Sequence, residues 1–262
     1  RKLTLILIAL SLIFLIEGVY AADIAYVVKS TSRVNSDITT VMNEMGYSYQ
    51  VVTETQISST NFSQYRLILV GNDIFQNPSR IPVNEHNSLI FNQYHYYKKG
   101  TTDFQWGWAK DQGILSRSIL NLNNNNNVTI TQGLPSQFTA YNAGGVNAYI
   151  LSGQKPIGIT YVTYSGNPSN GDYVVALAQP NTLMLNGNRT VGRSLFFGLV
   201  ETDFWTADTR KLFKNSLEWS IKGQDKDQDG FFDNDCNDNN ASINPNGTEI
   251  AYNRVDENCD KF

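Results

Sequence analysis

Four short apolar runs, separated by polar turn residues, constrain most strongly what the first third of this chain can fold into. They are Ile24–Val28, Tyr49–Thr53, Leu67–Val70 and Ser88–Asn92. Each run is too short for a buried helix and is rich in β-branched or aliphatic residues, which favours a strand. Between the first two, Asp37–Met45 carries apolar residues at helical spacing. This order of strands and helical segments predicts an α/β fold with a doubly wound, mostly parallel sheet.

The middle of the chain has a different pattern. Gly100–Asn127 contains Trp106 and Trp108 and ends in a run of Asn, which predicts an irregular surface segment around one helix near Asp111–Leu120. Four apolar runs then alternate with Gly, Pro and Asn turns, and we expect antiparallel additions to the sheet at Ala148–Leu151, Ile157–Tyr164, Tyr173–Ala178 and Thr182–Leu185.

A last strand and helix close this region. Arg193–Val200 is apolar throughout its centre and predicts a buried strand. Thr206–Ile221 has one apolar stripe at helical spacing, with Thr206 as its N-cap and Gly223 after its end. It is the clearest helix in the sequence.

Ligand sites in parallel sheets lie beyond the carboxyl ends of the strands. Here those ends carry Ser30–Ser32, Gly71–Asp73 and Asn92–His95. His95 is the one plausible general acid or base, with Asp73 as its partner. The alternative is that His95 belongs to an aromatic surface formed with the neighbouring tyrosines.

The N-terminal residues have the pattern of an export signal. Arg1 and Lys2 precede an apolar run, Leu3–Ile16, and Val19 and Ala21 fit a signal-peptidase site before residue 22. We therefore expect a signal peptide over residues 1–21. The alternative is an uncleaved membrane anchor, although the run is short for a span of about 20 residues. No second apolar span follows it in the sequence.

The C-terminal residues are strongly acidic. Residues 225–260 contain ten acids and two bases, which leaves the remainder of the chain with a net charge of +4. A block of acids is either a solvated linker or a cation site. Nothing in the composition indicates a basic nucleic-acid-binding face.

The start of this block, DKDQDGFFDNDC, has the register of a calcium loop. Alternating carboxylates direct hard oxygens at one ion, and a Gly at position 6 permits the turn. The first three carboxylates are Asp225, Asp227 and Asp229, and the Phe231 carbonyl and Asp233 follow at positions 7 and 9. Position 12 is Cys236 in place of Glu, so Asp235 or Asp238 must complete the site.

The chain has two cysteines, Cys236 and Cys259, and both lie in the acidic block. In an exported protein an even pair favours a disulfide. The alternative is two free thiols.

The whole stretch from residue 225 to 260 resembles the MopE-type metal-binding repeat. The elements D-x-D-x-D-G, D-C-[DN]-D, [IV]-x-P-x-x-x-E and N-x-x-D-x-[ND]-C-D all occur in it, in that order. The resemblance implies a surface or secreted location and calcium binding. It adds to the candidate ligands Asn237, Asn239, Glu249, Asp256, Asn258 and Asp260. Residues 222–262 contain no His and no Met, which disfavours copper.

Two further segments resemble the class I glutamine amidotransferase-like superfamily, in particular its ThuA-like members. They are RSLFFGLVETDFWTADTRKLFKNSLEWSI, residues 193–221, and TITQGLPSQFTAY, residues 129–141. The resemblance implies a flavodoxin-like layered fold. The amidotransferase chemistry does not carry over, because no Cys precedes Cys236 and no G-x-S-x-G element replaces it.

Together these features predict a signal peptide over residues 1–21, an α/β domain over 22–222 and an acidic metal-binding module over 223–262. We expect a secreted or cell-surface calcium-binding protein whose α/β domain binds a carbohydrate or protein ligand without catalysis. The alternative is a secreted hydrolase, carbohydrate-active in one version, that uses a strand-end cleft near Asp73 and His95.

Overall fold

The structure is a computed structural model of the chain. It describes residues 21–98, 105–116, 119–123, 128–165, 172–223, 227, 229, 231, 235–237 and 239–260. All of the predicted signal peptide except Ala21, and three of the predicted metal ligands, lie outside the described residues; those ligands are Asp225, Asp233 and Asp238.

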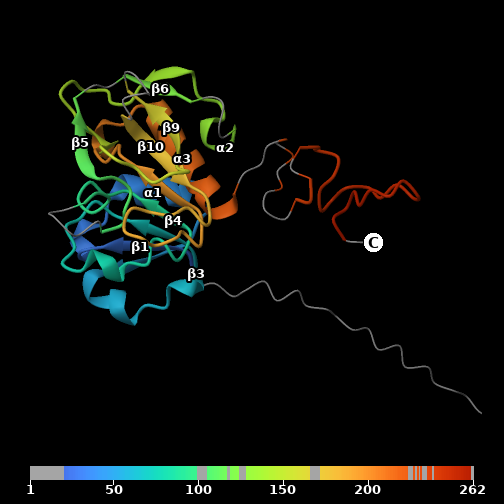
Figure 1. Cartoon of the computed structure of the whole chain (residues 1–262), viewed down its shortest axis with the longest axis horizontal. Helices are drawn as coiled ribbons and strands as arrows, with labels where there is room; N and C mark the ends of the chain where they lie inside the picture. Colours follow the sequence, from blue (N-terminus) through green and yellow to red (C-terminus); the bar gives the residue numbers. More distant parts are fainter. Residues whose placement is uncertain are drawn as a thin grey trace, which may run out of the picture.

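One half of the sheet is parallel and forms the centre of the fold (Figure 1). Its strands lie in the order β2-β1-β3-β4-β11, and every neighbouring pair is parallel. They are β1 (Ala22–Val28), β2 (Tyr49–Thr53), β3 (Tyr65–Val70), β4 (Ser88–Ile90) and β11 (Ser194–Phe197). β3 and β11 are apolar along almost their whole length because both faces of the sheet are covered there.

The other half of the sheet is antiparallel and continues from β11 in the order β10-β9-β6-β7. β8 pairs with both β10 and β5 beside this path. These strands are β5 (Asp111–Leu115), β6 (Ile119–Leu122), β7 (Gln137–Thr139), β8 (Ala148–Ser152), β9 (Thr160–Tyr164) and β10 (Tyr173–Ala178). The predicted α/β class, a parallel core with antiparallel additions, is confirmed.

Two local predictions in this half are wrong. Asp111–Leu120 is not a helix but contributes β5 and the start of β6. Gly113 lets β5 lie close against β8, since a Cβ there would be 2.3 Å from Ile150 Cγ1. Thr182–Leu185 is a turn with one isolated bridge from Leu183, because the Thr182 hydroxyl and N–H bond locally to Gln179 and Thr190 in place of a neighbouring strand.

Three α-helices accompany the sheet in the described residues: α1 (Ser36–Glu44), α2 (Val128–Thr131) and α3 (Ala207–Lys222). Short 3-10 turns take the place of longer connecting helices elsewhere: η1 (Thr31–Arg33), η2 (Glu54–Ser59), η3 (Phe62–Gln64), η4 (Pro78–Arg80) and η6 (Thr202–Phe204). α3 packs on β3, β4 and β11.

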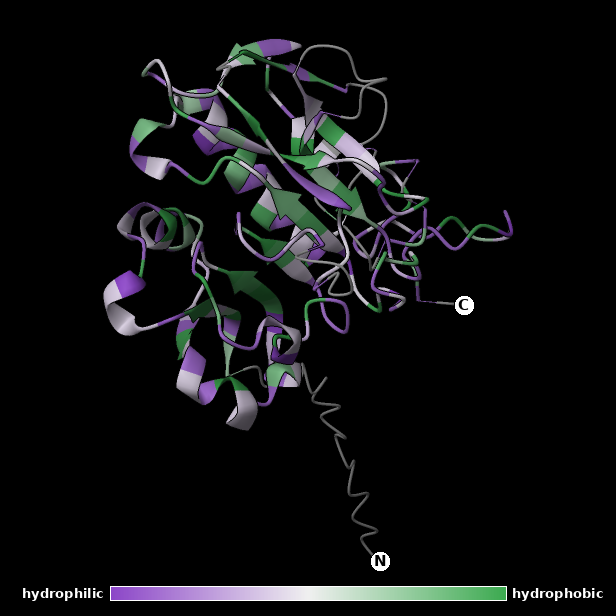
Figure 2. Ribbon diagram, turned by 60° about the vertical axis from the view of Figure 1, so that its left-hand side comes forward, coloured by the Kyte–Doolittle hydropathy of each residue, from purple (hydrophilic) through white to green (hydrophobic). Residues whose placement is uncertain are grey.

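The core lies between α3 and the sheet, where Figure 2 shows hydrophobic residues concentrated in the strands. Phe213 of α3 meets Phe91, Phe197 and Trp205, with ring centroids 5.0–5.9 Å apart. Contacts of this kind bury large aromatic area at low entropic cost. Trp106 and Trp108 are also fully buried, so they belong to the core and not to an exposed surface.

Gly223 ends α3, with its N–H donating to the Trp219 carbonyl. Beyond it, the described part of the C-terminal segment, residues 223–262, contains turns and bends but no helix or strand. Within the described residues, no helix is both long enough and apolar enough to cross a bilayer.

Candidate metal centre

Three aspartates of the C-terminal segment converge on one point. Asp227, Asp229 and Asp235 each place a carboxylate oxygen within 4.8 Å of the others. We call this group the aspartate cluster. The sequence placed the first two of these residues at positions 3 and 5 of a calcium loop and offered Asp235 to complete it. The structure brings all three together.

Backbone hydrogen bonds aim two of these side chains. Asp229 Oδ1 accepts the N–H of Phe231 at 2.9 Å, and Asp235 Oδ1 accepts the N–H of Asn237 at 2.8 Å. A carboxylate that bonds the backbone two residues ahead closes an Asx turn. One oxygen of each side chain is thereby held by its own turn, and the second oxygen is left for the cluster.

Those second oxygens are buried without compensation. Asp229 Oδ2 and Asp235 Oδ2 have no hydrogen-bond partner within the part of the chain that the structure describes. Burying an ionised carboxylate oxygen costs free energy unless a hydrogen bond or a cation compensates it. Like charges at this separation add repulsion. A cation at the centre of the aspartate cluster removes both costs, so the residues present fit a bound metal ion.

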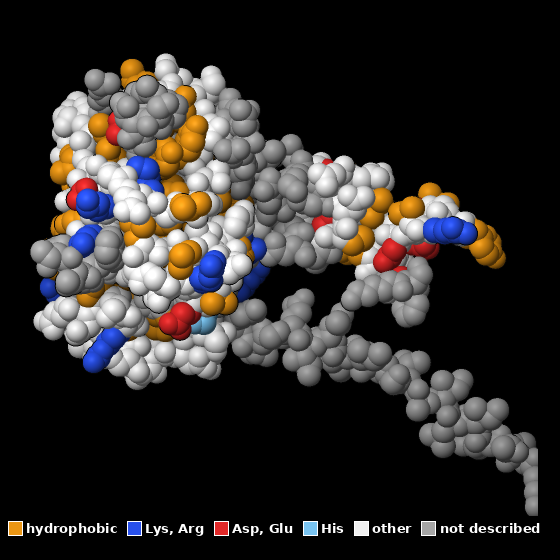
Figure 3. Space-filling view, in the orientation of Figure 1, with side chains coloured by type: hydrophobic (Ala, Val, Ile, Leu, Met, Phe, Trp, Pro, Cys, Tyr) orange, Lys and Arg blue, Asp and Glu red, His pale blue; other side chains and the backbone are white. Residues whose placement is uncertain are grey.

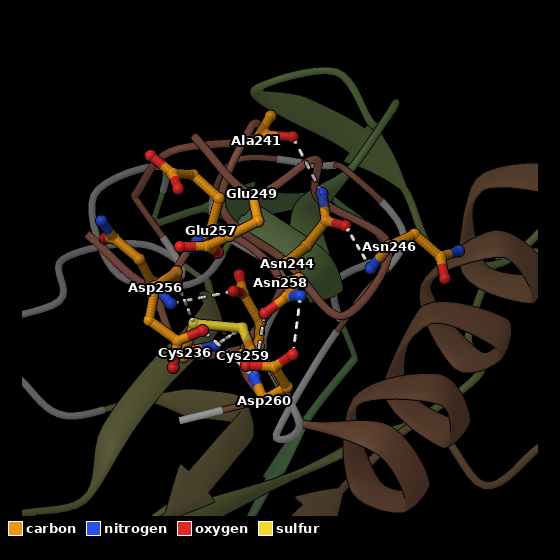
Figure 4. The surroundings of a disulfide bond; sticks show 12 residues. Cys236, Ala241, Asn244, Asn246, Glu249, Asp256, Glu257, Asn258, Cys259 and Asp260 are labelled. Atoms are coloured by element: carbon orange, nitrogen blue, oxygen red, sulfur yellow. Dashed lines mark hydrogen bonds between the residues drawn. A yellow bond between two sulfur atoms is a disulfide. The ribbon is translucent and has the colours of Figure 1, made fainter. Parts of the chain in front are cut away.

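The two cysteines form the predicted disulfide. Cys236 and Cys259 are bonded, with Cα atoms 5.6 Å apart, and the Cys236 N–H donates to Cys259 Sγ at 3.2 Å (Figure 4). Both sulfurs also lie near the Asp235 carboxylate. Because a disulfide sulfur is not a thiolate, it is a poor ligand for soft metals. The donors available to an ion are therefore oxygens, which suit a hard cation.

The remaining described candidates form a scaffold of turns. Asn237 and Asn239 are joined through their backbones, at 2.6 Å. Asp256 Oδ1 accepts the N–H of Asp260, and Asn258 Nδ2 donates to Asp260 Oδ2. The Glu249 carboxylate accepts the N–H of Glu257. None of these acidic residues joins the aspartate cluster among the described residues.

Asn side chains explain how the segment folds without regular structure. Four of them accept the N–H of the residue two positions on, at 2.8–3.2 Å: Asn240, Asn244, Asn253 and Asn258. Short amide side chains favour such turns. Figure 4 shows the turn from Asn244 to Asn246 beside the disulfide. The richness in Asn therefore has a structural role here.

Glu257 is a residue that the sequence analysis missed. It is only 6% exposed, and its Oε2 accepts the N–H of Ile250 at 3.1 Å while Oε1 bonds to Asn253 Nδ2. Its carbonyl accepts the N–H of Asn244 at 2.9 Å. The Ile250 N–H is the largest influence holding the pKa of Glu257 below its usual value. Glu257 stands at a variable position of the repeat pattern, so the sequence offered no signal beyond its charge.

The strand-end pair is not assembled for acid or base catalysis. Asp73 is buried, with Oδ1 2.8 Å from Arg33 Nε and Oδ2 accepting the Lys29 N–H at 2.9 Å. His95 Nε2 accepts the N–H of Phe75 at 2.9 Å, and Nδ1 lies 2.8 Å from Gln105 Oε1. His95 therefore has an aromatic, packed environment, as the alternative interpretation expected. That environment is core and not surface, because His95 is 2% exposed.

Solved structures of similar arrangement have very different sequences. One is described as a putative GMP synthase subunit protein from Thermoplasma acidophilum, with 15% identity over 77% of this chain and 95% of that chain, at a TM-score of 0.44. A glutamine amidotransferase from Thermotoga maritima has 9% identity over 76% and 97%, at 0.43. A cytoplasmic protein from Salmonella typhimurium has 7% identity over 75% and 98%, at 0.45.

No curated protein is significantly similar to the chain in sequence. One family model matches its C-terminal segment. The match covers residues 235–261, from Asp235 through both cysteines, and so includes one member of the aspartate cluster together with the whole disulfide loop. Residues 235–261 match the family described as a putative metal-binding motif.

Proposed function

We propose that residues 223–262 form a calcium-binding module of an exported protein. The observation that carries this proposal is the aspartate cluster, in which oxygens of Asp227, Asp229 and Asp235 converge and two of them are buried without a hydrogen bond. The family match over residues 235–261 supports a metal ion in this segment. Asp225, Asp233 and Asp238 remain candidate ligands by their position in the loop pattern.

The choice of calcium rests on the donor set. Residues 222–262 contain no His or Met, and their two cysteines are oxidised, so copper and zinc would lack their usual ligands. Magnesium requires a near-ideal octahedron and gives up its water reluctantly. Calcium accepts six to eight oxygens in a flexible loop, and this segment is a succession of turns.

Two features support export. The disulfide is of a kind that persists in oxidising compartments. Cleavage before Ala22 would leave β1 whole, because the strand begins at that residue. N-terminal sequencing of the protein from its native host should therefore start at Ala22. Recovery of Leu3–Ile16 in the mature protein would favour a membrane anchor instead.

We propose a binding role without catalysis for residues 22–222. Asp73 is engaged by Arg33 and the Lys29 N–H, and both ring nitrogens of His95 have partners within the core. No observation on the described residues favours the hydrolase alternative. Glutamine incubated with the purified protein should release no ammonia. Release that His95→Gln abolishes would contradict this proposal.

The metal proposal is tested by calorimetry on the purified full chain, stripped with EDTA and then titrated with calcium, magnesium or copper(II) in separate runs. Calcium should give a saturable heat at micromolar to millimolar concentration, the range that such sites cover. Magnesium should bind more weakly. Absence of calcium heat at millimolar ion, or tighter binding of copper(II) by the oxidised chain, would overturn the assignment.

A further inference from the structure

The parallel half of the sheet contains a topological switch point. The chain leaves β1 for β2 on one side and then returns to β3 on the other side of β1. The loops after β1 and β3 therefore diverge in opposite directions. In open α/β sheets a crevice forms at this point, beyond the carboxyl ends of the strands, and ligands bind in it.

A cavity of about 300 Å³ occupies this position. The segment after β1 supplies Ser32, Arg33 and Asn35 to its wall, and the segment after β3 supplies Asn72 and Asp73. Phe91 follows β4, and Val200 and Glu201 follow β11. The cavity thus collects residues from the ends of four parallel strands, at the small end of the size range of ligand pockets. His95 does not line it.

The charges on the wall disfavour an anion. Arg33 is the one cationic side chain among the described residues that line the cavity, and Asp73 neutralises it at 2.8 Å. Glu201 then leaves the wall with a net negative charge. A zwitterion is disfavoured for a related reason, because a carboxylate placed on Arg33 would also lie close to the buried Asp73.

The wall nevertheless offers both kinds of hydrogen-bonding group. Asp73 occupies Arg33 Nε, which leaves the terminal N–H groups of that guanidinium as donors. Burial raises the pKa of Tyr26 to about 12, so its hydroxyl stays protonated at the cavity wall. Glu201 is an acceptor. Hydroxyl groups on a ligand both donate and accept, so they match this mixture without bringing charge.

We propose that this cavity binds a small, neutral, polyhydroxylated compound of monosaccharide size. Its hydroxyls bond to Arg33 and Glu201, and its C–H groups contact Phe91 and Val200. The site does not depend on the metal module, so it stands or falls separately from the calcium proposal.

The test is ligand-observed saturation-transfer NMR on the full chain, with D-glucose, D-mannose and myo-inositol as probes at millimolar concentration. Inorganic phosphate and glycine serve as the anionic and zwitterionic probes. At least one neutral probe should bind, and Glu201→Gln should weaken it by roughly tenfold, about 1.4 kcal/mol. The matched control is Glu85→Gln, which makes the same change at an exposed residue outside the cavity wall.

Arg33→Lys keeps the charge but loses the planar fork, and should also weaken binding. The melting temperature of each variant establishes that it is folded. The proposal is overturned if no neutral probe binds, if phosphate or glycine binds more tightly than all of them, or if Glu201→Gln and Arg33→Lys bind the neutral probe as Glu85→Gln does.

Discussion

Single side chains in the C-terminal segment divide into those that would hold an ion and those that hold the turns. Asp229 and Asp235 do both, because one oxygen of each accepts a backbone N–H and the other is buried in the aspartate cluster. Asn at either position can keep the turn and loses only the charge. The exchange of Asp for Asn therefore separates the two roles.

We predict that Asp235→Asn weakens calcium binding by roughly tenfold or more, about 1.4 kcal/mol for each factor of ten, since affinity in such loops follows the number of charged ligands. Titration calorimetry on the full chain measures it. Asp203→Asn is the control, because Asp203 is an exposed aspartate in η6. Equal affinities for the two variants would remove Asp235 from the site.

Glu257 leads to a pH prediction. Its folded pKa is lowered below the ordinary value of 4.5, chiefly by the Ile250 N–H. Its charged form therefore stabilises the fold fully above pH about 4.5, and this contribution is lost as the pH falls through the lower, folded pKa. Hydrogen exchange at the Ile250 amide should accelerate over that acidic range.

Glu257→Gln provides the comparison. It should exchange faster than the native chain at neutral pH, and the difference should shrink as acid neutralises Glu257 in the native chain. A gap between the two proteins that is the same at pH 7 and below the folded pKa would mean that the carboxylate charge is not what protects Ile250.

The sequence was most informative where residue type alone carries the chemistry. Alternating Asp and a paired Cys predicted Asp227, Asp229 and the disulfide, because few other uses exist for those residues at that spacing. It could not find Glu257, whose role depends on which way a turn points its side chain. Figure 3 shows the acidic side chains of this segment close to exposed hydrophobic ones, which no periodic pattern announces.

Among the elements, α3 is anchored by a cap that also joins it to the sheet. Thr206 Oγ1 accepts the N–H of Thr209 at 3.3 Å and lies 2.7 Å from the Thr139 carbonyl of β7, to which it donates. Thr206→Ala should cost about 1 kcal/mol and lower the melting temperature by about 2–4 °C. Thr206→Ser keeps the hydroxyl and should be close to native in a thermal melt, and equal losses in both variants would exclude the cap as the cause.

Gly198, just after β11, is fixed by close backbone contacts. A Cβ on Gly198 would lie 1.9 Å from the Tyr149 carbonyl oxygen and 2.8 Å from that of Val174, in the neighbouring strands β8 and β10. Backbone cannot move aside cheaply, so Gly198→Ala should destabilise the fold by at least about 1–3 kcal/mol. At Gly144 an added Cβ meets nothing within 4 Å. Chemical denaturation should therefore separate Gly198→Ala from a near-neutral Gly144→Ala.

The two longer helices and most strands were predictable because their period is local. α3 has the expected cap and stripe, and β10 has the predicted bounds. β5 was missed because its only reason to be a strand is its partner β8, which lies 33 residues or more along the chain from its last residue. The switch-point cavity was foreseen only as strand ends, since strand order is not written in any one segment.

On the scale of the whole molecule, the C-terminal segment differs from the sheet in what holds it together. The sheet has a continuous apolar core, whereas Ile250 and Val255 of the segment are 59% and 41% exposed. So small a set of apolar contacts cannot offset the chain entropy of about 36 residues, at about 1.5 kcal/mol for each. A bound ion and the Cys236–Cys259 bond are left as the main sources of cohesion.

These two sources have similar expected sizes. Closing the loop between Cys236 and Cys259, which are 23 positions apart, contributes about 3 kcal/mol. Calcium at a hundred times its dissociation constant contributes about 2.7 kcal/mol. Limited proteolysis of the full chain should therefore show four graded states. Cleavage between residues 224 and 262 should be slowest with calcium and an intact disulfide, intermediate with either alone, and fastest after EDTA and a thiol reductant together. The melting transition of the sheet should stay unchanged in all four, because neither agent touches its core. If EDTA leaves the cleavage rate unchanged in both the oxidised and the reduced chain, then no metal ion stabilises the segment. If instead EDTA also lowers the melting temperature of the sheet, the segment and the sheet fold as one unit.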